Sequence, residues 1–227
     1  MLKKTFLTFV FLTLLTTFYG MNANFGLHGT RTADARIGSV GKAEVAHTIS
    51  VYDELIRSVS EEEGYDWRLM SAIAYHESRF LPDIVSKRGA AGLMQIMPAV
   101  ARQFNVTGDR LLDPETNVRL AAQVLSKINA GLRFAPGTSD DDRMSIMLAS
   151  YNGGIGHVND ARRLARSHGE NPDSWETVAR YLAFKALPEY YEQQEVRCGR
   201  FTGSRQTTAY VRDVLNRYDR YCRIATR

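Results

Sequence analysis

The sequence predicts an all-α domain of about seven to nine short helices, and three observations lead to this fold class. Apolar residues recur at helical spacing along most of the chain from about residue 50 onward. Helix-start signals, such as an Asp or an Asp-Pro pair, precede several of these stretches. Alternating patterns typical of strands are scarce, with residues 195–201 as the candidate for a short extended stretch. We therefore expect helices joined by turns and at most a minor extended segment.

Apolar stripes and caps define the helices expected in the first half. Residues 50–63 carry aliphatic side chains at helical spacing. Asp66 can cap a helix whose apolar side leads to Glu77. Asp113 and Pro114 form an N-cap followed by proline at the first helical position, and an apolar stripe follows them. These signals predict three helices before residue 130.

The second half shows the same periodicity. Residues 140–142 are three consecutive aspartates, which favour a helix N-terminus rather than a calcium loop. Further helices are expected over residues 155–168 and 175–181. The last predicted helix covers residues 206–221 and places Tyr210 on its apolar side. The expected architecture is therefore helical to the end of the chain.

Length and charge favour one ordinary globular domain. The chain has 227 residues, of which 44% are apolar, so it can bury a core without metal or disulfide links. The formal net charge is +4, and it falls to about +2 without Lys3 and Lys4. Such a mild positive excess gives no reason to expect nucleic-acid binding.

The N-terminus has the pattern of an export signal. Lys3 and Lys4 precede an uncharged apolar stretch over residues 5–19. This stretch is shorter than the roughly 20 apolar residues that span a bilayer. We predict a protein of the periplasm or cell envelope; an uncleaved anchor, which would hold the protein at the membrane, is the alternative. The predicted divisions are a signal peptide over 1–23, a flexible linker over 24–46 and a helical domain over 47–227.

Two cysteines, Cys198 and Cys222, are present. They form no Cys-x-x-Cys motif, which excludes a zinc ribbon or a thioredoxin motif, and the histidines show no metal-binding spacing. In an exported chain the two thiols can pair, and we predict a Cys198–Cys222 disulfide. Two buried free thiols remain the alternative.

Glu77 is the strongest candidate for a catalytic group. It lies four residues after Ile73, seven after Met70 and ten after Trp67, on the apolar stripe of its own helix. A carboxylate facing a core is costly unless it is paired or protonated, and burial raises its pKa. A carboxyl that keeps its proton near neutral pH can act as a general acid on a glycosidic oxygen. A buried Glu in a structural hydrogen-bond network is the alternative.

Three separated motifs surround this candidate. Glu77-Ser78 is followed by Gly-Leu-Met-Gln-Ile-Met-Pro at residues 92–98 and by Ser-Tyr-Asn-Gly-Gly at residues 150–154. In this order the motifs resemble the soluble-lytic-transglycosylase-like (SLT domain) family, which has a lysozyme-like helical fold with a glycan-binding groove. The resemblance extends from about residue 51 to residue 221.

The resemblance implies roles for individual residues. Glu77 matches the family's single catalytic acid/base, with no metal and no organic cofactor. Residues implied to bind the glycan are Ser86, Gln95, Met97, Tyr151, Asn152 and Gln206. Residues implied to support the site are Ser78, Asn117 and Tyr210. Gln206 stands where the family often has Glu, which removes any acidic role at that position.

The implied activity is that of a peptidoglycan lytic transglycosylase acting as a monomer on glycan strands. Such an enzyme cleaves the β-1,4 bond between N-acetylmuramic acid and N-acetylglucosamine and leaves 1,6-anhydro ends. Two alternatives stay open. One is a goose-type lysozyme-like hydrolase in which Asp83 or another acid orients water. The other is a non-catalytic peptidoglycan-binding module.

Overall fold

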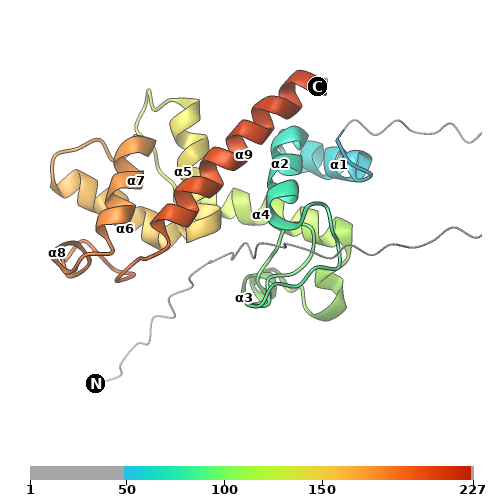
Figure 1. The fold of residues 1–227 in the computed structure, drawn as a ribbon, viewed down its shortest axis with the longest axis horizontal. Helices are drawn as coiled ribbons and strands as arrows, with labels where there is room; N and C mark the ends of the chain where they lie inside the picture. Colours follow the sequence, from blue (N-terminus) through green and yellow to red (C-terminus); the bar gives the residue numbers. More distant parts are fainter. Residues whose placement is uncertain (1–48, 226–227) are drawn as a thin grey trace, which may run out of the picture.

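The computed structural model describes residues 49–225, and this part of the chain is helical as predicted (Figure 1). Two short 3₁₀ turns, Arg102–Phe104 and Gly108–Leu111, accompany its α-helices. The α-helices are α1 Asp53–Glu63, α2 Trp67–Ser78, α3 Pro98–Ala101, α4 Pro114–Gly131, α5 Asp140–Gly153, α6 Ile155–Ser167, α7 Trp175–Phe184, α8 Pro188–Tyr191 and α9 Ser204–Ile224.

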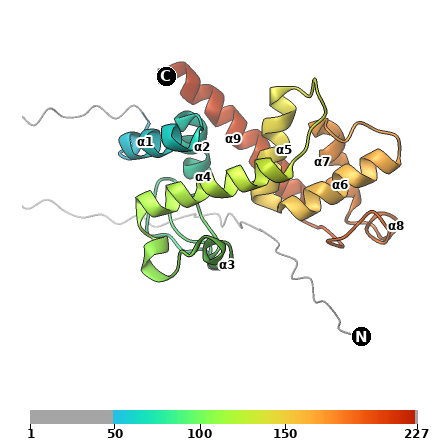
Figure 2. The ribbon, with the colours of Figure 1, turned by 180° about the vertical axis from the view of Figure 1, so that it is seen from behind.

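Two long helices connect the two halves of the fold. Helices α1 to α3 form one half and α5 to α8 the other, and α9 crosses between them on one side (Figure 1). Helix α4 runs along the opposite side, from α1 to α5 (Figure 2). Helix α9 packs most extensively on α2 and also contacts α5 and α7. The interface between α2 and α9 therefore joins the first half of the chain to its end, and Glu77 lies there.

The predicted helix starts at Asp66 and Asp113 are confirmed. The Asp66 side chain accepts a hydrogen bond from the Arg68 N–H at the start of α2, at 2.9 Å. Asp113 caps α4 in the same way, with Pro114 at the first helical position. At α5 the cap is Ser139, so the three aspartates occupy the first turn, where negative charge is favoured by the helix dipole.

The extended segment expected over residues 195–201 is wrong. This part of the chain is irregular, and the N–H groups of Arg197 and Cys198 donate to the buried side chain of Asp160 instead of to a neighbouring strand. Extended pairing occurs elsewhere, as isolated bridges from Ala91 to Val85 and to Ile96. These bridges shape the loop that follows Glu77.

The predicted Cys198–Cys222 disulfide is also wrong, since both thiols are free. Cys198 precedes α9 and its N–H donates to Asp160, whereas Cys222 lies in the last turns of α9. The helix from Ser204 to Cys222 alone spans about 27 Å at a rise of about 1.5 Å per residue. A disulfide requires Cα atoms within about 7 Å, so the length of α9 keeps the two thiols apart.

The predicted signal peptide over 1–23 and linker over 24–46 lie outside the described residues. Within residues 49–225, no helix combines the length and the hydropathy needed to cross a membrane.

Candidate active site

Glu77 lies in the last turn of α2 and is partly buried. Met70 and Ile73 on the same stripe are fully buried, which confirms that this side of α2 faces the core. The next residues, Arg79 and Phe80, have positive φ angles of 56° and 63°. Two consecutive non-glycine residues in this region turn the chain sharply, and such strained backbone is concentrated at functional sites.

Burial raises the pKa of Glu77 to about 8, and the nearby Tyr210 hydroxyl opposes this rise. No salt bridge joins Glu77 to a cation in the described part of the chain. Among the described carboxyls whose pKa clearly departs from its ordinary value, Glu77 is the one that is raised. Its carboxyl therefore holds a proton at neutral pH and can donate it.

Two buried tyrosines stand beside this carboxyl. Burial, and next the negative charge of Glu77, raise the pKa of both Tyr151 and Tyr210 well above the ordinary value, so their hydroxyls stay neutral. Tyr151 donates its hydroxyl to the Met94 carbonyl at 2.9 Å. The buried Tyr210 hydroxyl has no hydrogen-bond partner of normal geometry among the described residues. It is therefore free to donate to Glu77 when that carboxyl ionises.

Asn117 holds the second motif in place. Its side-chain oxygen accepts from the Met94 N–H at 2.7 Å, and its amide group donates to the carbonyls of Ala91 and Leu111. Gly92 has φ +80°, and a Cβ there would lie 2.5 Å from the Asn117 amide nitrogen. Only glycine fits this position, so the Gly-Leu-Met-Gln motif and Asn117 form one packed unit.

Two residues expected to bind glycan, Gln95 and Ser86, form hydrogen bonds within the loop that follows α2. Gln95 is buried, and its amide nitrogen donates at 3.0 Å to the carbonyls of Ile84 and Gly92. The partly exposed Ser86 accepts at Oγ from the Ala90 N–H. These bonds show how the sequence shapes the loop beside Glu77.

The third motif, residues 150–154, is hydrogen-bonded to α9. Asn152 is buried and accepts at Oδ1 from the Thr207 hydroxyl at 3.0 Å. A Cβ on Gly153 would lie 2.9 Å from that same hydroxyl oxygen, so α5 and α9 cross closely here. Gln206 is partly exposed, one helical turn before Tyr210. Thr207 was not among the predicted site residues, because its contact with Asn152 joins segments 55 residues apart in the sequence.

The remaining predicted residues are easily placed. Ser78 donates its hydroxyl to the Ala74 carbonyl one turn earlier, which is a structural bond within α2. Met97 caps α3 and packs partly buried against the core. Asp83 is exposed in the loop after α2. Residues 49–225 contain no cluster of His, Cys, Asp and Glu that could hold a metal ion.

In the described residues, Glu77 lies beside two buried tyrosines, Tyr151 and Tyr210, in a helical domain. Residues 54–174 match the family described as the transglycosylase SLT domain, and the chain belongs to this family. The resemblance stated from the motifs is thereby confirmed. Gln206 and Tyr210 lie beyond the matched residues.

Longer known proteins are similar in sequence to most of this chain. The chain is 35% identical over 202 residues to membrane-bound lytic murein transglycosylase F of Alcanivorax borkumensis, covering 89% of this chain and 40% of that protein. The protein of the same name from Marinobacter nauticus is 33% identical over 193 residues, covering 83% and 37%. The chain thus spans about two fifths of the length of these relatives.

A solved structure has the same fold. The X-ray structure of an inactive mutant of the lytic transglycosylase Slt from Pseudomonas aeruginosa matches with a TM-score of 0.50 and 21% identity. The match covers 78% of this chain and 25% of that one. The predicted lysozyme-like all-α fold is therefore confirmed.

Proposed function

We propose that this protein is a peptidoglycan lytic transglycosylase with Glu77 as its single catalytic acid/base. Its substrate is the β-1,4 bond between N-acetylmuramic acid and N-acetylglucosamine. The observation that carries the proposal is a partly buried carboxyl whose pKa is raised to about 8, with no cation paired to it. Membership of the SLT domain family and likeness to proteins named lytic murein transglycosylases support the same reaction.

The reaction needs one acid that later acts as a base. Glu77 donates its proton to the glycosidic oxygen, and the bond from that oxygen to C1 of the muramic residue breaks. The resulting Glu77 carboxylate accepts the proton of the muramic C6 hydroxyl, and the C6 oxygen bonds to C1. The product is a 1,6-anhydro end, and Glu77 regains its proton. Because the nucleophile belongs to the same sugar, its effective concentration is high and no activated water is needed.

The tyrosines suit the second half of this cycle. When Glu77 is ionised, Tyr210 can donate a hydrogen bond to it and stabilise the charge in a dry site. Tyr151 fixes the loop that carries Gln95 and Met97 against α5. We propose that Gln95 and Met97, together with Ser86, Asn152 and Gln206, line the glycan groove.

A goose-type hydrolase is less well supported. A second carboxyl would have to activate water, but the nearest candidate, Asp83, is exposed in the loop after α2. A non-catalytic binding module would have no use for a proton-holding acid. We further propose that the protein acts as a monomer in the periplasm or cell envelope and reaches it through the predicted signal in 1–23.

Product analysis tests the proposal. The full chain is incubated with purified sacculi, and the released muropeptides are identified by mass spectrometry. We expect anhydro-ended products, each lighter by one water than the reducing products of a lysozyme. Reducing ends would assign the protein to the hydrolases, and no release at all would leave only a binding role.

A further inference from the structure

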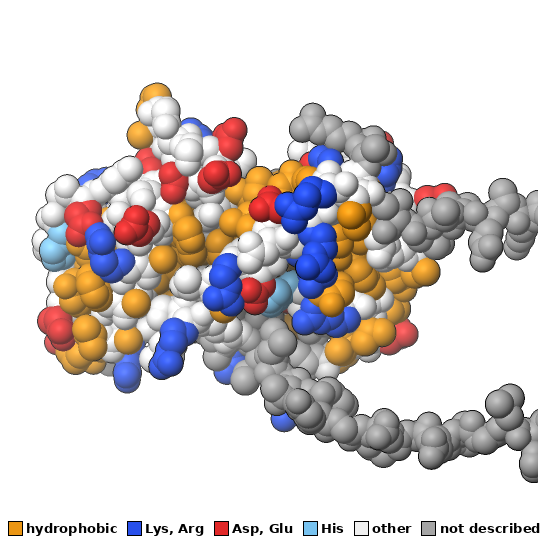
Figure 3. Space-filling view, turned by 45° about the horizontal axis from the view of Figure 1, so that its top comes forward, with side chains coloured by type: hydrophobic (Ala, Val, Ile, Leu, Met, Phe, Trp, Pro, Cys, Tyr) orange, Lys and Arg blue, Asp and Glu red, His pale blue; other side chains and the backbone are white. Residues whose placement is uncertain are grey.

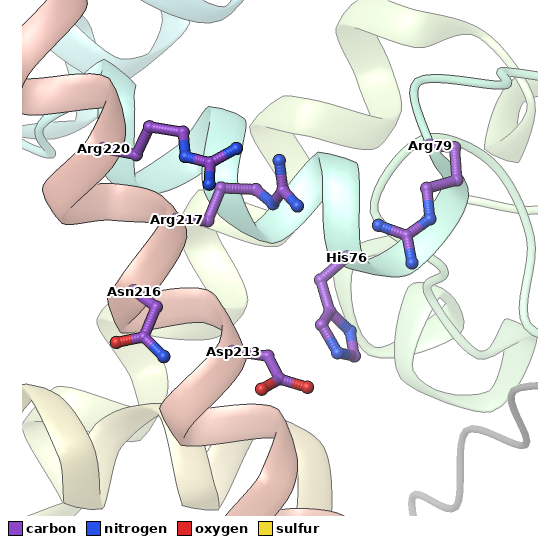
Figure 4. A pocket seen from close by; sticks show the side chains of 6 residues that line it. All are labelled: His76, Arg79, Asp213, Asn216, Arg217 and Arg220. Atoms are coloured by element: carbon purple, nitrogen blue, oxygen red, sulfur yellow. The ribbon is translucent and has the colours of Figure 1, made fainter.

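A second polar site lies beside the catalytic glutamate. It is a pocket of about 270 Å³ between the end of α2 and the second half of α9 (Figure 4). On the molecular surface, Lys and Arg side chains gather beside a histidine on this face (Figure 3). The residues that line the pocket are His76, Arg79, Asp213, Asn216, Arg217 and Arg220.

The charge of the pocket is positive and is not neutralised from within. Arg79, Arg217 and Arg220 form no salt bridge with any carboxylate of residues 49–225. Asp213 supplies the single carboxylate, and it pairs with Arg212 outside the lining at 2.9 Å. Three guanidinium groups against one shared carboxylate favour an anionic ligand.

Two of the arginines are held by an aromatic ring. The guanidinium carbon of Arg217 lies 3.4 Å from the ring centroid of Tyr75, and that of Arg79 lies 4.2 Å from it. Arg217 also bonds the Tyr221 hydroxyl. Stacking fixes the planes of the two guanidinium groups, which lowers the entropy lost on binding a carboxylate. His76 is neutral at pH 7, because burial, and next the charge of Arg79, lower its pKa to about 4.

The pocket continues the face of α9 that carries the active site. Tyr210, Asp213, Arg217 and Arg220 follow one another at spacings of three and four residues, so they share one side of the helix. Along the axis, Arg217 and Arg220 lie about 10 and 15 Å beyond Tyr210. An extended peptide advances about 3.3 Å per residue, so roughly three to five residues cover this distance.

We propose that this pocket binds the carboxylates of the peptide stem attached to the muramic acid at the cleavage site. The inference rests on the proposed function and extends it from the glycan to the peptide. Peptide stems are short, begin at the lactyl group of muramic acid and carry free carboxylates. Arginine forks bind carboxylates with two parallel hydrogen bonds. The enzyme therefore prefers glycan strands that still bear their stems.

The test compares two soluble glycan strands of equal length, one with stems and one stripped by an amidase so that only lactyl carboxylates remain. We expect a higher kcat/KM on the stemmed strand for the wild-type chain. The variants Arg217→Ala and Arg220→Gln should each lower the stemmed-to-stripped ratio about 10-fold, the scale of one charge-assisted hydrogen bond. Arg223→Ala, on the same helix but outside the pocket, should keep the wild-type ratio.

Binding is measured separately from turnover, by calorimetry with the Glu77→Gln chain. Tighter binding of the stemmed strand, lost on adding Arg220→Gln, supports the inference. Equal cleavage of both strands by the wild type, together with equal binding of both by Glu77→Gln, would overturn it while leaving the transglycosylase proposal intact. An equal loss on both strands in the variants would also overturn it, since that indicates a structural role. If neither strand is cleaved or bound, the proposed function itself fails.

Discussion

Two carboxyls of the protein, Glu77 on α2 and Asp160 on α6, have pKa values shifted in opposite directions. Glu77, between α2 and α9, has no cation partner, and burial raises its pKa to about 8. Asp160, on α6, is fully buried, and it accepts the Lys185 ammonium at 2.6 Å and the N–H groups of Arg197 and Cys198 at 2.9 Å. Burial alone would raise the pKa of Asp160 as well, but these hydrogen bonds lower it below the ordinary value.

The two carboxyls differ in their partners. Asp160 stays ionised, because Lys185 and Arg163 supply charge while two backbone donors satisfy its remaining acceptor capacity. Lys185 also contacts His157 Nδ1, and its backbone carbonyl accepts from the Phe201 N–H. This cluster therefore fixes the irregular segment that leads into α9. Burial raises the pKa of a carboxyl only where no counter-charge opposes it, and this separates Glu77 from Asp160.

Replacing Glu77 should have the largest effect on activity. Glu77→Gln keeps the size and a hydrogen-bonding amide but removes the proton that the reaction transfers. We expect activity on sacculi to fall by at least about 100-fold, the usual scale for a general acid/base. Release of anhydro-muropeptides, quantified by mass spectrometry, measures the loss. Full activity in this variant would remove Glu77 from the mechanism.

The same variant should be more stable than the wild type, with a definite pH dependence. A folded-state pKa raised above the unfolded value favours the protonated fold, so stability decreases as the pH rises from about 4.5 toward about 8. Each pKa unit corresponds to about 1.4 kcal/mol. In denaturant unfolding, the stability of the variant relative to the wild type should increase between pH 4.5 and about pH 8 and stay constant at higher pH. A constant difference would contradict the raised pKa.

Asp160→Asn should act on stability instead. The change leaves Lys185 buried without its negative partner, and removing one member of a buried ion pair costs about 3–5 kcal/mol. The sign of the pH effect is the reverse of that for Glu77. The lowered pKa of Asp160 stabilises the wild-type fold above the unfolded pKa, and this contribution is lost as the pH falls through the folded value. Denaturant unfolding of both proteins at neutral and acidic pH measures the effect, and their difference should shrink in acid.

Tyr210→Phe should shift the pH dependence of kcat/KM more than it lowers the maximal kcat/KM. The Tyr210 hydroxyl lowers the pKa of Glu77, so its removal should raise that pKa further. Since the first step needs protonated Glu77, the loss of activity at high pH should move upward by as much as about one pH unit. The pH dependence of kcat/KM on a soluble glycan strand measures the shift. A downward shift would mean that the tyrosine stabilises the protonated acid.

Local signals made much of the fold predictable. The caps at Asp66 and Asp113 depend on a few neighbouring residues, and the apolar stripe that ends in Glu77 depends on spacing along one helix. Both kinds of pattern depend on residues close together in the sequence and not on contacts with distant segments. The position of Glu77 on the core-facing side of α2 and its raised pKa could therefore be predicted from the sequence.

Contacts between distant segments could not be predicted in this way. Asp160 and Lys185 pair across two helices, and Asn152 binds Thr207 on the last helix, where sequence spacing carries no signal. The predicted disulfide failed for the same reason, because the helix between the two segments holds them apart. Side-chain roles in the glycan groove stay predictions, and the internal bonds of Gln95 appear only in the folded loop.

Asp83→Asn should have the smallest effect, and it is the matched control for Glu77→Gln. Both changes convert a carboxyl to an amide in the same stretch of chain, but Asp83 is exposed and Glu77 is partly buried. An intramolecular C6 hydroxyl needs no second carboxyl, so activity should stay within about 2-fold of the wild type, well below the scale of general acid/base loss. Turnover on sacculi and the mass of the released ends are measured together. Loss of activity in Asp83→Asn, combined with reducing ends from the wild type, would show that water is the nucleophile and that a pair of carboxyls performs the cleavage.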